Sequence, residues 1–257
     1  MQVDFKSPVY SVGYDRILNR HFSFQDDCAE QLRYWEDRFS GERIFVVGNG
    51  PSLADTPMDL LANEYSFATN NISDLYDKTR WRPSFYSVMT TNAKRWRVPI
   101  RRTLELGIPS FVWWRRAFLG YYPNIWWTDF PFGNEKRILR KDVSKYGLMK
   151  YGSSIMPCIQ LSFYMGFKEI YLVGCDLGFR PKRMKEPSHN HFSDEYWRGD
   201  KEIRQSKADL WNTNMADGHR IAYEKGKSLG VKMYNATVGG ELEVYPRVDL
   251  REICSSS

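Results

Sequence analysis

Short apolar runs alternate with longer segments of helical spacing along most of this 257-residue chain. Several runs are continuously apolar, which is typical of parallel strands covered on both faces. Six runs have the length and composition of strands: residues 44–47, 66–69, 85–89, 110–113, 170–173 and 231–234. Strands that alternate with helices imply right-handed βαβ crossovers. The pattern therefore predicts an α/β fold in which helices cover both faces of a mostly parallel sheet.

Helix start and stop signals lie between these runs. Thr56-Pro57 starts one predicted helix, with the threonine as its N-cap and proline at the first helical position. Ser153 or Ser154 can cap a second helix, which runs to residue 165 and ends at Gly166. Residues 208–229 predict a longer third helix, closed by a glycine at position 230.

Two stretches fit the strand–helix alternation poorly. Residues 118–149 are rich in Trp and Arg, and residues 178–207 carry prolines and many charges. Ligands of open parallel sheets bind beyond the carboxyl ends of the strands, so insertions there are candidate lids. Residues 1–40 precede the first strand-like run. We therefore expect an N-terminal helical extension over residues 1–40 and a Rossmann-like domain with a lid-like insertion over residues 41–257.

The composition is that of a chain that can bury a core, with 42% hydrophobic and 26% charged residues. No apolar run approaches the roughly 20 residues needed to span a bilayer, and the first residues lack the apolar stretch of a signal peptide. The four cysteines form no Cys-x-x-Cys pair, so neither a structural zinc site nor a disulfide framework is predicted. We expect a cytoplasmic protein.

The formal net charge is +6, and aromatic residues lie among the basic ones. This interleaving is compatible with binding to a nucleic-acid backbone, to sugar rings and phosphates, or to a membrane-associated or acidic substrate. No helix-turn-helix, zinc-finger or RNP signature is present, so we expect no nucleic-acid partner. Peripheral association with the inner face of a membrane, and oligomer formation, stay open.

A glycine-containing turn, residues 48–53, directly follows the first apolar run. Glycines let the backbone approach an anion closely, so that amides can point at phosphate oxygens. Leu53 takes the place of the third glycine of a dinucleotide motif, and no Gly-Lys-Ser/Thr follows, so neither the dinucleotide fingerprint nor the P-loop is present. The turn predicts a phosphate site formed by four residues: Gly48, Asn49, Gly50 and Ser52.

Further polar residues follow other predicted strands. Asn70-Asn71 ends the second run and is suited to nucleoside or sugar hydroxyls, although asparagine is also an ordinary turn residue. Gly152-Ser153-Ser154 opens a predicted helix and forms either a second anion site or a plain N-cap. Asp176 follows the run 170–173, where it can hold a substrate hydroxyl, coordinate a metal, orient a base or make a structural Asx turn.

Two of the four histidines, His189 and His191, flank a single residue in a polar segment. A metal site would need a third ligand that the sequence does not identify. A single histidine of near-neutral pKa suits removal of a proton from a hydroxyl. His191, with Tyr196 nearby, is the predicted general base, and no metal ligand is assigned.

Five motifs occur in order along the chain: residues 48–53, 152–154, 165–176, 190–192 and 234–240. This series resembles a bacterial and archaeal family described as 6-hydroxymethylpterin diphosphokinase MptE-like, which includes the central domain of Maf flagellin glycosyltransferases. The early motifs are also similar to those of Campylobacter-type bacterial sialyltransferases. The resemblance spans about residues 41–250 and is specific for the superfamily rather than for one reaction.

The resemblance to the sialyltransferases implies site roles for several residues. Asn49, Asn70 and Ser154 match positions that contact a CMP-sugar donor, and His191 lies where that family supplies its base. Ile155 follows Ser154, where the sialyltransferases have glycine, so the sugar contacts differ. The closing segment Asn-Ala-Thr-Val-Gly-Gly matches the MptE-like and Maf proteins better.

These features predict a metal-independent glycosyltransferase of cell-surface polysaccharide biosynthesis. It would move a sialic-acid-like sugar from a CMP donor to a glycan or protein hydroxyl, with no further cofactor. The expected acceptor-binding residues are Tyr196, Trp113 and Arg115. One alternative is an ATP- and Mg²⁺-dependent diphosphokinase acting on a pterin alcohol, with the metal held by Asp176 and Asp194. Another is a non-catalytic nucleotide- or glycan-binding module.

Overall fold

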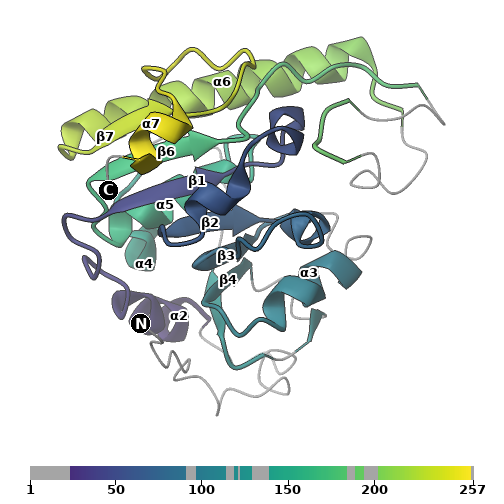
Figure 1. Ribbon diagram of the computed structural model, residues 1–257. Coiled ribbons are helices and arrows are strands. Elements are labelled where there is room, and N and C mark those ends of the chain that lie inside the picture. The colour runs from purple at the N-terminus through teal and green to yellow at the C-terminus, as the bar shows by residue number, and fades with distance from the viewer. Residues whose placement is uncertain are drawn as a thin grey trace.

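The computed structural model describes residues 24–90, 97–113, 119–120, 122–128, 139–183, 189–193 and 202–255. Within these residues, seven parallel strands form one sheet: β1 (Arg43–Val47), β2 (Ser66–Thr69), β3 (Phe85–Val88), β4 (Ser110–Trp113), β5 (Ile125–Thr128), β6 (Glu169–Val173) and β7 (Lys232–Asn235). The helices are α2 (Phe24–Arg33), α3 (Arg97–Leu104), α4 (Val143–Tyr146), α5 (Ile155–Tyr164), α6 (Gln205–Ser228) and α7 (Leu250–Ser255). The predicted Rossmann-like α/β fold is confirmed (Figure 1).

The strand order is β5-β4-β3-β2-β1-β6-β7 and reverses its direction of growth at β1. The chain builds outward from β1 to β5, and then returns to the other side of β1 for β6 and β7. In open α/β sheets, ligands bind beyond the carboxyl ends of the strands at such a switch point. The topology therefore brings the ends of β1, β2 and β6 together where a ligand is expected.

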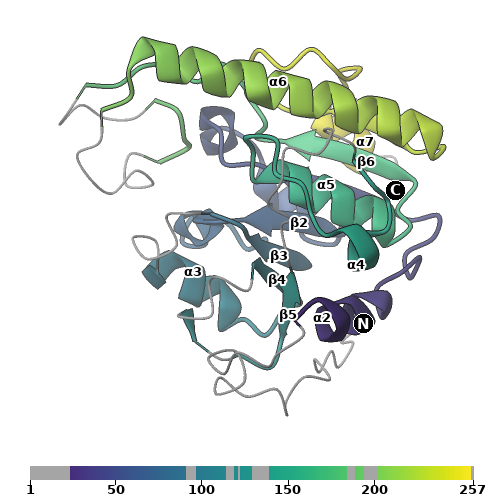
Figure 2. The same ribbon diagram turned by 180° about the vertical axis from the view of Figure 1, so that it is seen from behind.

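Alternate residues of each strand face opposite sides of the sheet, and both sides are covered. Ile44 and Val46 of β1 belong to a hydrophobic cluster that contains residues of α2, α4, α5 and α6. Phe45 and Val47 belong to a second cluster, with residues of α3, α7 and the 3₁₀ turns Pro51–Ala54, Met58–Leu61 and Ile72–Leu75. Figures 1 and 2 show α5 on one side of the sheet and α7 on the other.

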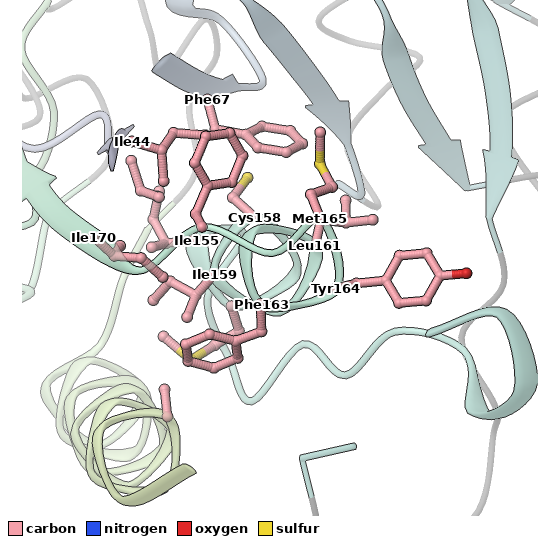
Figure 3. Packing of buried hydrophobic residues seen from close by; sticks show 14 of the residues in the cluster. Ile44, Phe67, Ile155, Cys158, Ile159, Leu161, Phe163, Tyr164, Met165 and Ile170 are labelled. Atoms are coloured by element: carbon pink, nitrogen blue, oxygen red, sulfur yellow. The ribbon is translucent and has the colours of Figure 1, made fainter. Parts of the chain in front are cut away.

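Helix α5 is buried along its whole length because strands lie on one side and α6 on another. A helix in such a position is apolar all round. Figure 3 shows Cys158 on the side of α5 that faces Ile44 and Phe67, whereas Tyr164 points away from them. The predicted helix end is confirmed, because Gly166 has a φ of +92° directly after the C-cap residue of α5.

Three sequence predictions change in detail. The predicted helix 208–229 is α6, which begins at Gln205 and ends at Ser228. The predicted α-helix after Thr56-Pro57 is wrong: a single 3₁₀ turn forms there, and the Thr56 hydroxyl donates to the Ser52 carbonyl oxygen (2.9 Å) instead of capping a helix. Strand β5 lies within the stretch 118–149, for which the sequence predicted a candidate lid rather than a strand.

Residues of the N-terminal segment pack into the main core. Trp35 is fully buried, with ring centroids 5.1 Å from Trp126, 5.6 Å from Phe111 and 5.8 Å from Phe85. Leu32 belongs to the same cluster. The segment after α2 thus completes the hydrophobic layer beneath β3, β4 and β5. None of the described helices is both long and apolar enough to cross a lipid bilayer.

Candidate active site

A cavity of about 890 Å³ lies at the carboxyl ends of the central strands. Gly48 after β1, Asn70 after β2, Thr90 after β3 and Asp176 after β6 line it, together with the residues that open α5 and the first half of α6. Its position is the switch point between β1 and β6. The volume is in the range of about 300–1,000 Å³ that is typical of small-molecule sites.

Two asparagines, which follow β1 and β2, donate hydrogen bonds to neighbouring segments at this switch point. The Asn49 amide nitrogen donates to the Thr69 carbonyl oxygen (3.1 Å), and the Asn70 amide nitrogen donates to the Ser154 hydroxyl oxygen (3.0 Å). The Oδ1 atoms of Asn49 and Asn70 are buried and have no hydrogen-bond partner among the described residues. An unsatisfied buried oxygen costs about 1–3 kcal/mol. A ligand that brings N–H or O–H donors would remove that cost.

The residues that open α5 line the same cavity. Gly152 precedes it with a φ of +78°, a conformation that favours glycine. Ser153 Oγ accepts from the Ile155 amide (3.3 Å), and Ser154 is the N-cap residue. Lys150 also lines the cavity. The positive end of the helix and this ammonium together favour an anion, as a phosphate would be.

The backbone amides of the 48–53 turn are engaged inside the protein. The Gly48 amide donates to Val173 O (2.7 Å) and the Gly50 amide to Gly174 O (2.9 Å). The Ser52 amide donates to Asp176 Oδ1 (3.1 Å). These three amides, which were expected to bind phosphate, are thus occupied in this conformation. The turn offers a ligand the Asn49 side chain instead.

Asp176 locks this turn to the end of β6. Its Oδ2 accepts from the Ser52 hydroxyl (2.8 Å), and its carbonyl oxygen accepts from the Glu241 amide (2.7 Å). A Cβ added at Gly50 would lie 1.8 Å from Asp176 Oδ2, so only glycine fits there. Burial raises the pKa of Asp176, and the hydrogen bonds from Ser52 oppose that rise. This geometry describes a structural role for Asp176, which is to connect the turn after β1 with the end of β6.

His191 lies half-buried in the cavity wall, with its ring edge against Phe179 (centroids 5.6 Å apart, 83° between planes). Burial lowers the pKa of His191 to about 3, so the imidazole is neutral at physiological pH. The Phe192 amide donates to the Asn49 carbonyl oxygen (3.3 Å). This bond ties the histidine segment to the turn after β1.

Several lining residues were not predicted from the sequence. His219 on α6 is 4% exposed and lies 3.0 Å from the Tyr245 hydroxyl, measured from Nδ1. Burial lowers the pKa of His219 to about 4. Trp211 and Met215 precede it at four-residue intervals along the same helix face. This four-residue spacing is the sequence signal that could have identified these lining residues. A helix face that packs against the hydrophobic core gives the same spacing.

Other predicted residues are not brought to the cavity. Asn71 is fully buried and Ser52 is bonded to Asp176, and neither lines the cavity. Trp113 is 7% exposed and belongs to the core cluster. The remaining acceptor candidates, Arg115 and Tyr196, and the metal candidate Asp194 lie outside the described residues. Within the described parts of the chain, no three His, Cys, Asp or Glu side chains are grouped as a metal site would require.

Comparison with known proteins gives similarity of structure only. No protein-family model and no curated protein sequence matches the chain, so membership of the MptE-like family stays a prediction. The Maf glycosyltransferase from Magnetospirillum magneticum AMB-1 is similar in structure, with a TM-score of 0.53 and 15% sequence identity over 88% of this chain. The match covers 38% of that protein, so this chain spans less than half of its length.

The sialyltransferase CstII from Campylobacter jejuni, solved with CMP, matches with a TM-score of 0.47 and 12% identity, covering 81% of this chain and 85% of that one. A second structure of this sialyltransferase, with a trisaccharide acceptor and CMP, gives a TM-score of 0.47 and 13% identity, over 80% and 86% of the two chains. At such identities the comparisons show the fold that the chain shares with the Maf glycosyltransferase.

Proposed function

We propose that the chain is a glycosyltransferase that takes a sialic-acid-like sugar from a CMP-activated donor and transfers it to a hydroxyl of a glycan or protein. The observation that carries this proposal is a pair of buried oxygens, Asn49 Oδ1 and Asn70 Oδ1, that find no hydrogen-bond partner in the described part of the chain and line the cavity with the residues that open α5. The two oxygens suit the amine and hydroxyl donors of a nucleoside, and the helix N-terminus suits its phosphate. The fold is also that of the Maf glycosyltransferase.

The transfer requires one bond to form and one to break at the anomeric carbon. The acceptor oxygen bonds to that carbon as the bond from carbon to phosphate oxygen breaks, and CMP leaves with the electron pair. Lys150 and the α5 N-terminus stabilise the leaving phosphate. The proton of the acceptor hydroxyl passes to His191. A neutral imidazole can accept it, and the neighbouring phosphate charge favours the imidazolium that forms.

The use of Asp176 favours this reaction over the diphosphokinase alternative. That alternative needs Mg²⁺ on carboxylates, and Asp176 was one of its two candidates. Both Asp176 oxygens accept hydrogen bonds from Ser52. The chain also has no Asp-x-Asp pair of the kind that commonly holds the metal of other nucleotide-sugar enzymes.

Nucleotide binding tests the donor part of the proposal. CMP, CDP, ATP and a pterin alcohol are compared by thermal shift and calorimetry, each with and without Mg²⁺. CMP should stabilise the protein without metal, and N49A and N70A should each weaken CMP binding by about 5- to 30-fold, since a lost hydrogen bond is worth about 1–2 kcal/mol. N63A changes an exposed asparagine that does not line the cavity and is the matched control. Stabilisation by ATP only with Mg²⁺, and none by cytidine nucleotides, would contradict the proposal.

Turnover separates a transferase from a binding module. Wild-type protein should release CMP from CMP-sialic acid, and H191A should lower the rate by about 100-fold or more, the usual contribution of a general base. Full activity of H191A would remove the proposed base. CMP binding without any turnover, with every acceptor tested, would favour the non-catalytic module.

A further inference from the structure

The cavity has two halves with different side chains. The half at the strand ends carries the asparagine amides and the serine hydroxyls. The other half is formed by the segment after β6 and by the first half of α6, and large apolar side chains lie there among polar ones. Phe179, Leu210 and Trp211 lie there, and we call these three residues the apolar shelf. Leu210 is 57% exposed, so its side chain is accessible to a ligand in the cavity.

The helical period of α6 builds one side of this shelf. Leu210 and Trp211 lie one turn before Asn214 and Met215, so all four reach the same face of the helix and line the cavity. Lys207 lies one turn before Trp211, and its ammonium is 5.0 Å from the centroid of the Trp211 ring. A positive charge therefore stands at the outer end of the shelf.

Two asparagines fix the irregular segment that forms the other side. Asn212 accepts from the Phe179 amide (2.6 Å) and donates to the Phe179 carbonyl oxygen (2.8 Å). Asn190 accepts from the Arg180 amide (2.7 Å) and donates to the Arg180 carbonyl oxygen (3.0 Å). Two consecutive residues thus have both backbone groups bonded to side-chain amides. Such a doubly held segment presents Phe179 and Arg180 in a defined position.

Three rings connect the shelf with the proposed base. Trp211 meets Phe179 edge to face, with centroids 5.3 Å apart and an angle of 89°. Phe179 meets His191 in the same manner at 5.6 Å and 83°. A sugar ring that contacts Phe179 or Trp211 therefore lies near the His191 imidazole, because the steps between ring centroids are 5.3 and 5.6 Å. The shelf is therefore placed where an acceptor, rather than the donor nucleotide, would lie.

The charges around the shelf select the kind of acceptor. Arg180 is exposed at the cavity, and no described residue forms a hydrogen bond or ion pair with its guanidinium. Two acids are among the described residues of the lining: Asp176 binds Ser52, and the Glu241 carboxyl lies against Gly178, which itself lines the cavity. The planar fork of an arginine matches a carboxylate or a phosphate. Arg180 and Lys207 thus leave two cations beside an apolar surface.

We propose that the apolar shelf, with Arg180 and Lys207, is the acceptor subsite for a glycan that carries an anionic sugar. One ring of the acceptor packs on Trp211 and Leu210, and its carboxylate or phosphate pairs with Arg180. The inference rests on the proposed function, since it assigns the second substrate of the same site.

Kinetics with three related acceptors test the subsite: lactose, sialyllactose, which carries a carboxylate, and a phosphorylated lactose. Wild-type KM should be at least about tenfold lower for an anionic acceptor than for lactose, as expected for a paired charge. R180A should raise the KM of the anionic acceptors by about tenfold and change that of lactose little. L210E loses the apolar contact and also repels an anion, so it should raise the KM of all three acceptors and that of the anionic ones most. L210K loses the same contact without repelling the anion, so it should raise the KM of the anionic acceptors less than L210E does. R220A removes an exposed arginine of α6 outside the cavity and should behave as wild type.

Donor hydrolysis without acceptor and CMP binding are measured on the same variants, so the two proposals fail separately. Intact CMP binding together with unchanged acceptor KM in R180A and L210E would overturn the subsite alone. Equal KM values for lactose and both anionic acceptors would overturn its anionic selectivity. If the wild type neither binds nor cleaves the donor, the proposed function fails. Saturation-transfer NMR with the three sugars still decides the subsite then, because sialyllactose signals must weaken in R180A and persist in R220A.

Discussion

Gly50 and Asp176 are the most closely fitted pair at the site. Gly50 has an ordinary extended conformation, so the obstacle to alanine is steric: its Cβ would lie 1.8 Å from Asp176 Oδ2 and 2.8 Å from the Gly174 carbonyl oxygen. We expect G50A to cost about 1–3 kcal/mol of unfolding free energy through overpacking. D176A should cost a similar amount because it removes the two hydrogen bonds to Ser52.

The double variant distinguishes this contact from two independent effects. D176A removes the nearer of the two clashing oxygens and leaves the Gly174 carbonyl oxygen 2.8 Å away, so G50A/D176A should be less destabilised than the sum of the single changes, by about 1 kcal/mol. Urea denaturation of the four proteins gives this coupling. G41A is the additive control in the same background, because its Cβ would meet no atom within 4 Å and its φ of +93° strains alanine independently of Asp176. If the losses of unfolding free energy in G50A and D176A simply add in the double variant, the close contact between Gly50 and Asp176 is contradicted.

His219 makes stability depend on pH. Its pKa is lowered from 6.5 to about 4 by burial, so between these values the unfolded chain binds a proton that the folded protein does not. The contribution of neutral His219 to the free energy of unfolding is therefore fully present above pH 6.5. It is lost as the pH falls toward 4, by at most about 1.4 kcal/mol per pH unit. H219Q should reduce the slope in that window without abolishing it, because His191, whose pKa burial lowers to about 3, contributes in the same direction. Parallel profiles for H219Q and wild type would contradict the assignment.

At the residue scale, the sequence identifies which polar residues follow the strands but not where each side chain points. Asn49, Asn70 and Ser154 line the cavity as the motif resemblance implied, whereas Asn71, the next residue along, is buried away from it. Asn70 adopts a φ of +55°, a local choice that no spacing rule contains. Asp176 and Ser52 are 124 residues apart, so their pairing depends on the folded topology.

At the element scale, close packing of α6 depends on two glycines of its buried side. A Cβ at Gly218 would lie 2.7 Å from Tyr151 Cβ, in a segment where Tyr151 already has a φ of +41°. A Cβ at Gly226 would lie 2.5 Å from the Met233 sulfur, which is the flexible end of a side chain. A side chain at Gly218 would therefore meet atoms close to the backbone, whereas one at Gly226 would meet a flexible side chain.

We expect G218A to destabilise the protein by about 1–3 kcal/mol and to weaken CMP binding, because the segment 151–154 that opens α5 must shift. G226A should be close to neutral, since Met233 can rotate and alanine gains up to about 1 kcal/mol of helix propensity over glycine. Thermal melts and CMP titrations of both variants provide the comparison. Equal losses of CMP affinity in the two would show that the glycines act through overall stability.

The strand that the sequence did not predict has an identifiable cause. Strand β5 contains Trp126 and Trp127, and neighbouring basic residues made this stretch resemble a binding surface. Both tryptophans are buried, the first against Trp35 from a segment far earlier in the chain. Apolar runs with β-branched residues predicted the other six strands because their environment is apolar on both faces. A run of aromatic residues looks the same in the sequence whether it forms a buried strand or lines a binding pocket. Only the residues that pack against it distinguish the two.

At the scale of the whole molecule, the segment after α2 decides whether the chain unfolds as one unit. The sequence predicted residues 1–40 as an N-terminal helical extension and left open whether it docks on the main domain or on a partner. Trp35 lies fully buried among rings from β3, β4 and β5, and Phe39 stacks on Phe167 at 4.9 Å. Removing the Trp35 side chain should therefore cost the sheet itself about 3–5 kcal/mol, a large share of the roughly 5–15 kcal/mol that is typical of a whole domain.

We expect W35A to shift the complete urea transition to a lower midpoint with an unchanged slope, because the slope reports the surface exposed on unfolding. Far-UV circular dichroism follows the sheet and helices, and near-UV circular dichroism follows the buried rings. E36A changes an exposed neighbour and should keep the wild-type midpoint. An extension that docks independently predicts the opposite outcome: an early transition of small amplitude, followed by main unfolding at the wild-type midpoint. Coincident, shifted transitions would place residues 24–40 within the same cooperative unit as the site.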